Sequence, residues 1–486
     1  MKLFTLPEPE LQFAQGLHIC PRAGITRFCV YDSLLQTRRE RIHVGAIGNS
    51  TGLDKLSAWL NICSREIPSR YEAKQPNLFT AFPGFNRTSG FKAEYLLNSE
   101  IVRQITNSEL KEIANISYWD KRVAVAVDLY FKEAKFLAQN RTVDVIVCII
   151  PDSLYGKVTY EGMKSESEDS EISNKLITQD DEDDDEDITI IENNFRRQLK
   201  ARVMELGRPI QIIREHSLDG SHTDQQDEAT KAWNFCTALY YKSGQTIPWK
   251  MMTDANKPTV CAIGISFYQS RDRKTLNTSL AQIFDELGNG LILRGTPIQQ
   301  DKKDRRPYMT GEQSSELLER AIIEYRDALK TMPARVVIHK SANFRDCELD
   351  GLRSAAKKLN IGSIDFITVI NSSFRLFRGK TYPPYRGVRV EIDENTHLLY
   401  TKGSIPYYET YTGKYIPEPL EIRIVESEES PSTICQEILS LTKMNWNNTQ
   451  FDGKYPVTLG CSRKVGEILK YLPENQIPQI RYSYYM

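Results

Sequence analysis

Three apolar runs rich in β-branched residues constrain the fold of this chain more than any other feature. They are Val143-Asp-Val-Ile-Val-Cys-Ile-Ile-Pro151, Pro258–Tyr268 and Arg335-Val-Val-Ile-His-Lys340. Strands that are apolar on both faces are typical of a largely parallel sheet covered on both sides by helices. Helical patterns alternate with strand-like segments along the chain, at residues 115–140, 195–204, 229–241, 317–331 and 349–359. We therefore expect an α/β protein.

The size and composition of the chain narrow its class. Its 486 residues suffice for two or three domains, and 40% hydrophobic with 26% charged residues are ordinary for a soluble globular protein. No apolar run is long enough to span a membrane, and residues 1–7 lack the apolar core of a secretion signal. Nine cysteines without a Cys-x-x-Cys pair are typical of reduced, buried thiols. We expect a cytoplasmic protein without a membrane span.

Acidic residues are concentrated in one segment and conceal a basic remainder. Residues 165–187 hold 12 acidic residues and one lysine, a net charge of −11. Subtracting it from the overall charge of −1 leaves +10 on the rest of the chain. Adjacent like charges repel and cannot be buried, so this segment is expected to be a disordered insertion within an α/β unit. The basic remainder favours a polyanionic partner.

Two of the apolar runs resemble the core strands of a PIWI domain, the RNase H-like half of Argonaute proteins. In cleaving members a metal-binding Asp ends each strand, and Ser266 and Ser341 stand at the matching positions. Cleavage by two metal ions needs carboxylate ligands, for which a neutral hydroxyl is a poor substitute. Arg463 stands where cleaving relatives carry Asp or His, and an Arg would repel a metal and favour a backbone phosphate. The resemblance implies a protein that holds a guide strand without cutting; the remaining catalytic position, a Glu, is not located.

A second resemblance concerns the MID domain, where Argonautes hold the 5′ phosphate of a guide. The matching positions in this chain are Arg196, Lys200, Gln211, Asn234 and Lys242. Residues four apart share a helix face, so Arg196 and Lys200 are expected to project together and form an anion site, in which Arg can bind phosphate bidentately. Arg196 replaces the aromatic residue that would stack on the first guide base, and Ala238 replaces a second Lys. At these two positions the chain differs from the pattern of residues that bind the 5′ phosphate in Argonautes.

The chain ends in an aromatic tail, Ile480-Arg-Tyr-Ser-Tyr-Tyr-Met486. In many prokaryotic Argonautes the final carboxylate reaches the MID pocket and helps to hold a divalent ion on the guide phosphate. The resemblance thus implies that the Met486 carboxylate and a Mg²⁺ ion act together at the 5′ phosphate. A tail that simply packs on the surface is the alternative.

The resemblance extends over the whole chain and is to short prokaryotic Argonautes, which contain MID and PIWI but lack the N and PAZ domains. It rests on Glu8–Phe13, Pro21–Ile25, His43–Gly48, Phe82–Phe85, Asn445–Asn448 and Tyr455–Arg463. We expect an amino-terminal segment at 1–110 that packs on both domains and a partner, a Rossmann-like MID domain at 111–249, and an RNase H-like PIWI domain at 250–486.

The same resemblance implies the partners. A guide, expected to be RNA, would pair with single-stranded DNA of invaders such as plasmids or phage. An APAZ-domain protein with a sirtuin-type, TIR-type or nuclease effector would bind this chain and be activated, with oligomerisation as a further expectation. The acidic segment 165–187 could occupy the nucleic-acid groove until a guide displaces it. No enzymatic activity is expected of this chain itself.

Two other functions remain open from the sequence. One is an active guide-directed nuclease, since the fold expected for residues 250–486 is that of RNase H. The other is an interaction subunit whose nucleic-acid pocket has decayed, which the residues at 196 and 238 would allow. Cleavage of a matched target would identify the first, and the absence of guide binding would identify the second.

Overall fold

The computed structural model describes residues 1–36, 38–69, 75–159, 194–219, 227–244, 247–252, 259–271, 275–283, 290–298, 307–377, 383–413, 416–473 and 476–486. The chain forms two compact units. Unit 1 comprises residues 1–34, 72–79 and 246–486, and unit 2 comprises residues 35–71 and 80–245. The acidic segment 165–187 lies outside the described residues.

Unit 2 is built on a parallel sheet. The strands follow the order β5-β4-β7-β8, with β6 also paired to β4, and every pairing is parallel. Their bounds are Arg41–Gly48 (β4), Glu94–Leu96 (β5), Val102–Gln104 (β6), Val145–Ile150 (β7) and Ile210–Arg214 (β8). All six residues of β7 are buried, as expected for a strand covered on both faces.

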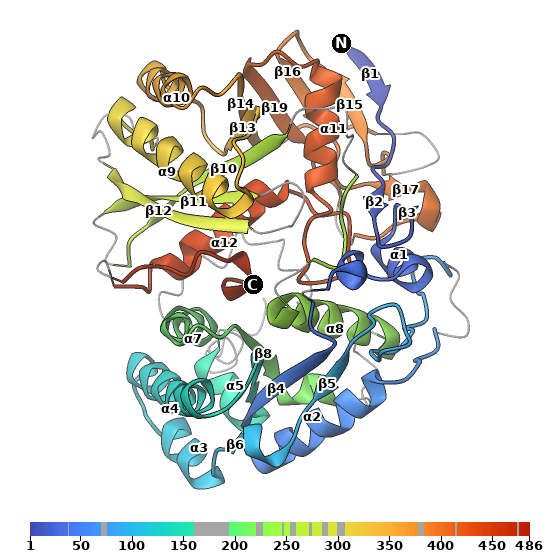
Figure 1. The fold of residues 1–486 in the computed structure, drawn as a ribbon, viewed down its shortest axis with the longest axis vertical. Helices are drawn as coiled ribbons and strands as arrows, with labels where there is room; N and C mark the ends of the chain where they lie inside the picture. Colours follow the sequence, from blue (N-terminus) through green and yellow to red (C-terminus); the bar gives the residue numbers. More distant parts are fainter. Residues whose placement is uncertain are drawn as a thin grey trace. The chain divides into compact units, whose positions relative to one another are not determined.

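Helices cover both faces of this sheet, as in a Rossmann-like domain (Figure 1). They are α2 (Ser50–Cys63), α3 (Asn107–Ala114), α4 (Trp119–Asn140), α5 (Asp152–Val158), α7 (Phe195–Val203) and α8 (Glu228–Gly244). Side chains of α3, α4, α5 and α7 pack in one core with Ile146, Cys148 and Ile150. The other residues of β7 alternate to the opposite face, where Ile149 contacts Gly52 of α2. Strands and helices alternate along the chain, and they form a unit of three layers, with the sheet between two layers of helices.

Unit 1 is built on a nine-stranded mixed sheet of order β1-β15-β16-β19-β14-β13-β10-β11-β12. Its strands are β1 (Lys2–Thr5), β10 (Val260–Gln269), β11 (Leu276–Ile283), β12 (Gly290–Ile298), β13 (Arg335–Lys340), β14 (Ser363–Asn371), β15 (Val388–Glu391), β16 (Thr396–Leu399) and β19 (Leu420–Glu426). Strands β10, β11 and β12 are antiparallel neighbours, whereas β10, β13 and β14 run parallel. This is the strand arrangement of an RNase H-like domain.

Two helix pairs cover the sheet of unit 1 (Figure 1). Helices α9 (Gly311–Leu329) and α10 (Asp346–Lys358) pack on one face with Ile263, Ile265 and Ile338. Helices α11 (Pro431–Leu441) and α12 (Val457–Leu469) pack on the other face. Smaller elements are α1 (Pro21–Phe28), the sheet of β2 (Leu11–Gln12), β3 (Leu17–His18) and β9 (Lys250–Met251), and the pair β17 (Ser404–Ile405) and β18 (Thr410–Tyr411).

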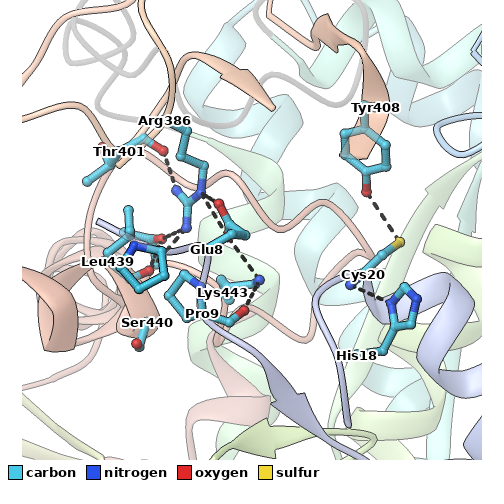
Figure 2. A network of polar contacts seen from close by, with 12 residues as sticks. Glu8, Pro9, His18, Cys20, Arg386, Thr401, Tyr408, Leu439, Ser440 and Lys443 are labelled. Atoms are coloured by element: carbon cyan, nitrogen blue, oxygen red, sulfur yellow. Dashed lines mark hydrogen bonds and ion pairs between the residues drawn. The ribbon is translucent and has the colours of Figure 1, made fainter. Parts of the chain in front are cut away.

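A buried charge cluster fixes the amino-terminal segment within unit 1 (Figure 2). The Glu8 carboxylate accepts hydrogen bonds from Arg386 Nε at 3.0 Å and from Lys443 Nζ at 2.9 Å. The side chains of Arg386 and Lys443 are fully buried. Arg386 also donates to the carbonyl oxygen of Leu439 at 3.1 Å, and its remaining partners include Thr401. One carboxylate therefore serves two buried cations.

The domain limits differ in detail from those expected from the sequence. Residues 41–48 and 94–104, which the sequence assigned to an amino-terminal segment, supply β4, β5 and β6 of the unit 2 sheet. Residues 1–34 instead belong to unit 1. Within the described part of the chain, no helix is both long and apolar enough to cross a bilayer.

Candidate nucleic-acid interface

In unit 2, the structure brings together two of the predicted phosphate-binding residues. Lys242 Nζ, on α8, donates a hydrogen bond to Gln211 Oε1, on β8, at 2.5 Å. Ile210 and Ile212 belong to the core beneath α4 and α7, so strand alternation turns Gln211 to the face on which α8 lies. Lys242 is only 4% exposed, which makes it a buried cation beside a neutral amide. The two residues are 31 positions apart in the sequence.

Helix α7 carries the other two predicted cations. Asn194 caps its first turn by accepting hydrogen bonds from the backbone N–H groups of Arg196 (2.9 Å) and Arg197 (3.4 Å). Phe195 and Leu199 are buried, whereas Arg196 and Lys200 are half-buried on the neighbouring stripe. The i, i+4 spacing thus places both cations on one side of the helix, as the sequence predicts.

Helix α8 carries Asn234 and Ala238 as well as Lys242. Asn234 is half-buried, while Ala238 is buried in the packing of the helix. The eight helical steps from Asn234 to Lys242 correspond to about 12 Å along the helix axis. Ala238 leaves no cation between them, so the α8 contribution to the pocket is one amide and one ammonium group.

These side chains suit an anion and do not by themselves suit a metal ion. Arg196, Lys200 and Lys242 carry positive charge, and Gln211 and Asn234 are neutral amides. Mg²⁺ prefers carboxylate, phosphate and water oxygens, and none of the five residues has a carboxylate. A Mg²⁺ ion here would need oxygen ligands from outside this set, and the predicted one, the Met486 carboxylate, belongs to unit 1. Met486 is buried, and the tail before it is attached to unit 1 by the Ile292 N–H, which donates to the Ile480 carbonyl oxygen at 2.7 Å.

In unit 1, the structure brings together Ser266 and Ser341. Strands β10 and β13 pair in parallel with Ile265 opposite Lys340, so the next residues, Ser266 and Ser341, lie side by side. The Ser341 N–H donates to the Ile265 carbonyl oxygen at 3.4 Å. Ser266 is 2% exposed, and Ser341 is half-buried at the carboxyl edge of the sheet. Two hydroxyls therefore stand on neighbouring strands, at the two positions for which the sequence resemblance implies carboxylates in cleaving Argonautes.

Helix α12 covers the face of the sheet that carries these serines. A methyl group on Gly264 would overlap the carbonyl group of Thr458, so glycine is required for the helix to approach β10 this closely. Thr458 Oγ1 also lies 2.9 Å from His339 Nδ1 on β13. Gly264 and His339 each precede a site serine by two residues, and side chains two apart share a sheet face. Ser266 and Ser341 thus point to the α12 side.

Arg463 lies in the middle of α12, which begins at Val457 and ends at Leu469. Its guanidinium lies over the ring of Tyr455, with Cζ 4.0 Å from the ring centroid. The Tyr455 hydroxyl donates to Asn371 Oδ1, at the end of β14, at 2.5 Å. Sequence reasoning missed the contribution of Asn371, and the only signal for Tyr455 was its place in a segment resembling PIWI domains.

The opposite face of the same sheet edge holds a buried ion pair. Lys340 Nζ donates to both carboxylate oxygens of Glu348 at 2.6 Å, and both side chains are fully buried. Glu348 also accepts from the backbone N–H groups of Met309 (3.0 Å) and Arg345 (2.9 Å). Burial lowers the pKa of Lys340, against the opposing effect of Glu348. This pair connects the end of β13, which precedes Ser341, to the first turn of α10.

Among the described residues, no group of three or more His, Cys, Asp or Glu side chains is placed to hold a metal ion. The edge that carries Ser266 and Ser341 offers two hydroxyls, and Arg463 on α12 adds a cation that lies over Tyr455, whose hydroxyl bonds Asn371 at the end of β14. Hydroxyls donate to phosphate oxygens, and a guanidinium does so with a full charge. The chemistry of this edge is therefore better suited to a phosphodiester than to a pair of divalent cations.

Comparison with known proteins identifies the fold. No family model matches the chain, and no curated protein matches its sequence. Among solved structures, the Clostridium butyricum Argonaute bound to a guide DNA and a 19-mer target DNA is similar over 98% of this chain and 53% of its own, with 16% identity and a TM-score of 0.67. Drosophila Piwi is similar over 99% and 56%, with 12% identity and a TM-score of 0.58.

A third similar structure is the Marinitoga piezophila Argonaute in complex with a 5′ OH guide RNA. It matches over 100% of this chain and 59% of its own, with 13% identity and a TM-score of 0.55. The chain thus spans little more than half the length of these Argonautes. The likeness establishes the fold, an α/β architecture with a Rossmann-like MID unit and an RNase H-like PIWI unit, as the sequence predicted.

Proposed function

We propose that this chain is a non-cleaving, guide-binding subunit of a bacterial defence system. It would hold the 5′ phosphate of a guide RNA in unit 2, pair the guide with single-stranded DNA of an invader, and activate an effector partner. The observation that carries the proposal is the contact of buried Lys242 with Gln211, at matching positions of a MID fold. A buried cation and an amide are groups that bind a terminal phosphate, and Arg196 and Lys200 on α7 would add two further cations.

The test of guide binding compares short RNA and DNA strands with a 5′ phosphate or a 5′ hydroxyl, by fluorescence anisotropy at several salt concentrations. We expect tighter binding of the 5′-phosphorylated strands, and loss of that preference in Lys200→Ala and Lys242→Met. Lys111→Ala is the matched control, because Lys111 is exposed on α3. Equal affinity for both 5′ ends in the unmodified protein would refute the phosphate pocket, and Lys200→Ala keeps the test valid if Lys242→Met does not fold.

The proposed lack of cleavage is supported by the two hydroxyls at the edge of β10 and β13. Phosphodiester hydrolysis with two metal ions needs ligands that neutralise about four positive charges, which Ser266 and Ser341 do not supply. Incubation of the protein with guide, labelled complementary target and Mg²⁺ or Mn²⁺ should leave the target intact. A guide-dependent product of defined length would instead identify an active nuclease.

The proposed partner is an APAZ-domain protein that carries a sirtuin-type, TIR-type or nuclease effector. This part of the proposal depends on the resemblance of segments such as His43–Gly48 and Phe82–Phe85 to short prokaryotic Argonautes. Affinity purification of the chain from its host, followed by mass spectrometry and sequencing of the bound nucleic acid, tests it. Recovery of a short RNA with an APAZ protein supports the proposal, and recovery of a partner without nucleic acid indicates an interaction subunit.

A further inference from the structure

Arg463 is a half-buried arginine held by an aromatic ring and not by a carboxylate. Its guanidinium lies over Tyr455 at 4.0 Å from the centroid, and among the described residues it forms no ion pair. Desolvation of a charge without a partner is unfavourable, and charged side chains that are fully buried are almost always paired. A cation in this setting is suited to an anionic ligand.

The support of Arg463 is itself fixed by the sheet. The Tyr455 hydroxyl donates to Asn371 Oδ1 at 2.5 Å, so the ring cannot rotate freely beneath the guanidinium. Stacking occupies the face of a guanidinium and leaves its in-plane N–H groups available as donors. An arginine held in this way loses little further side-chain entropy when it binds a phosphate bidentately.

The register of the parallel strands places this arrangement beside the two serines. Lys340 is opposite Thr368, so Ser341 is alongside Val369, and Asn371 lies two residues further on the same face. Two residues of a strand correspond to about 7 Å, close to the spacing of successive phosphates along a nucleic-acid strand. The hydroxyls of Ser266 and Ser341, the amide of Asn371 and Arg463 thus line one edge of the sheet.

We infer that Arg463, positioned by Tyr455 and Asn371, binds a backbone phosphate of the target strand at the edge where cleaving relatives bind metal ions. This inference depends on the proposed function for the identity of the ligand, a strand paired to a guide. It adds a specific role for the altered site: the cation replaces the charge neutralisation that metal ions would provide, so that the strand is held there and not cut. Tyr455 and Asn371 are positioning residues, and Arg463 makes the contact.

The experiment measures the affinity of the guide-loaded protein for complementary DNA over a range of salt concentrations. Arg463→Gln is expected to weaken target binding about tenfold, the loss of one charge-assisted hydrogen-bonded pair. It should also reduce the slope of log affinity against log salt by about 0.7–0.9, the contribution of one phosphate contact. Guide affinity should not change, because the predicted 5′ pocket belongs to the other unit.

Two further variants separate positioning from folding. Tyr455→Phe retains the ring and removes the bond to Asn371, so it should lower target affinity less than Arg463→Gln and leave the salt slope unchanged. Arg463→Lys should restore the salt slope but only part of the affinity, since an ammonium group neither stacks as a plane nor donates bidentately. Arg326→Gln is the matched control, because Arg326 is 52% exposed on α9.

A preformed RNA–DNA duplex is titrated in parallel, so that the contact of Arg463 with a phosphate is measured even if the pocket of unit 2 does not bind a guide end. Reduced duplex affinity and a reduced salt slope in Arg463→Gln support the inference whatever the outcome for the guide. An unchanged salt slope in both assays would overturn it, and a wild-type protein that ignores the 5′ phosphate would overturn only the proposed function.

Discussion

Replacement of Glu8 is predicted to lower the free energy of unfolding more than replacement of Lys443, one of the two buried cations that Glu8 contacts. Burial opposes ionisation of this carboxyl, yet the charges of Arg386 and Lys443 and their hydrogen bonds hold the pKa of Glu8 below its usual value. Glu8→Gln keeps the size of the side chain and removes the carboxylate that accepts hydrogen bonds from both cations in Figure 2. Two fully buried cations would then face a neutral amide.

The size of this loss depends on whether each buried cation can release its proton. Burial lowers the pKa of Lys443 to about 8, although Glu8 acts in the opposite direction. At pH 7, release of its proton costs about 1.4 kcal/mol, so this is the limit of the Lys443 contribution to the loss. Arg386 cannot release a proton, and a buried charge left without its partner typically costs about 3–5 kcal/mol. We expect Glu8→Gln to lower the free energy of unfolding by about 3–5 kcal/mol and Lys443→Met by about 1.5 kcal/mol or less.

Urea denaturation followed by tryptophan fluorescence measures both losses, and Trp249 reports locally because its Nε1–H donates to the Lys443 carbonyl oxygen at 3.0 Å. Glu10→Gln is the matched control, since Glu10 is exposed. The pH dependence adds a second test. The unfolded chain retains the Lys443 proton to higher pH than the folded chain, so the stability of the wild type relative to Lys443→Met should rise between about pH 8 and 10. A loss in Glu8→Gln no larger than in Lys443→Met would refute the reasoning.

Three further predictions concern the edge of the sheet near the serines. Glu348→Gln leaves Lys340 buried without its partner, and should lower the free energy of unfolding by about 3–5 kcal/mol in urea denaturation. Gly264→Ala forces a methyl group into Thr458 and should cost about 1–3 kcal/mol by the same assay, with weaker target binding because α12 must move. Burial lowers the pKa of His339 to about 3. Below about pH 6.5 the imidazole is therefore protonated in the unfolded chain but stays neutral in the folded chain. Stability should fall by about 2 kcal/mol more between pH 7 and pH 5 in the wild type than in His339→Leu.

Much of the fold was accessible from sequence because the core strands are apolar on both faces. The runs that contain β7, β10 and β13 were identified, and the expected helices at 229–241 and 317–331 correspond to α8 and α9. What the sequence did not reveal was pairing between distant segments. His43–Gly48 is the end of β4, which lies between β5 and β7, and no local pattern indicates that it pairs with residues about 100 positions later.

In the candidate sites, too, local features could be predicted from the sequence, whereas contacts between distant segments could not. The i, i+4 spacing of Arg196 and Lys200 is a local property and was correctly placed on one helix. The contact between Gln211 and Lys242 was implied only by family resemblance, since it depends on how α8 returns across the sheet. The stacking of Arg463 on Tyr455 was not foreseen, because Tyr455 precedes α12 by two residues and meets Asn371 from another strand.

The effect of metal removal on duplex affinity is a further measurement that distinguishes this chain from a metal-dependent nuclease. In a two-metal site the ions neutralise the strand, so chelation weakens both cleavage and strand binding. Here hydroxyls of Ser266 and Ser341 and the cation of Arg463 stand at that edge, so the affinity for a guide–target duplex with a 5′ hydroxyl should be the same in Mg²⁺ and in EDTA at equal ionic strength. The 5′ hydroxyl removes any ion that Met486 would hold on a guide phosphate, which leaves only the edge in unit 1. Binding that weakens several-fold in EDTA would require oxygen ligands that the described residues do not provide, and would contradict the assignment of this edge to a phosphate.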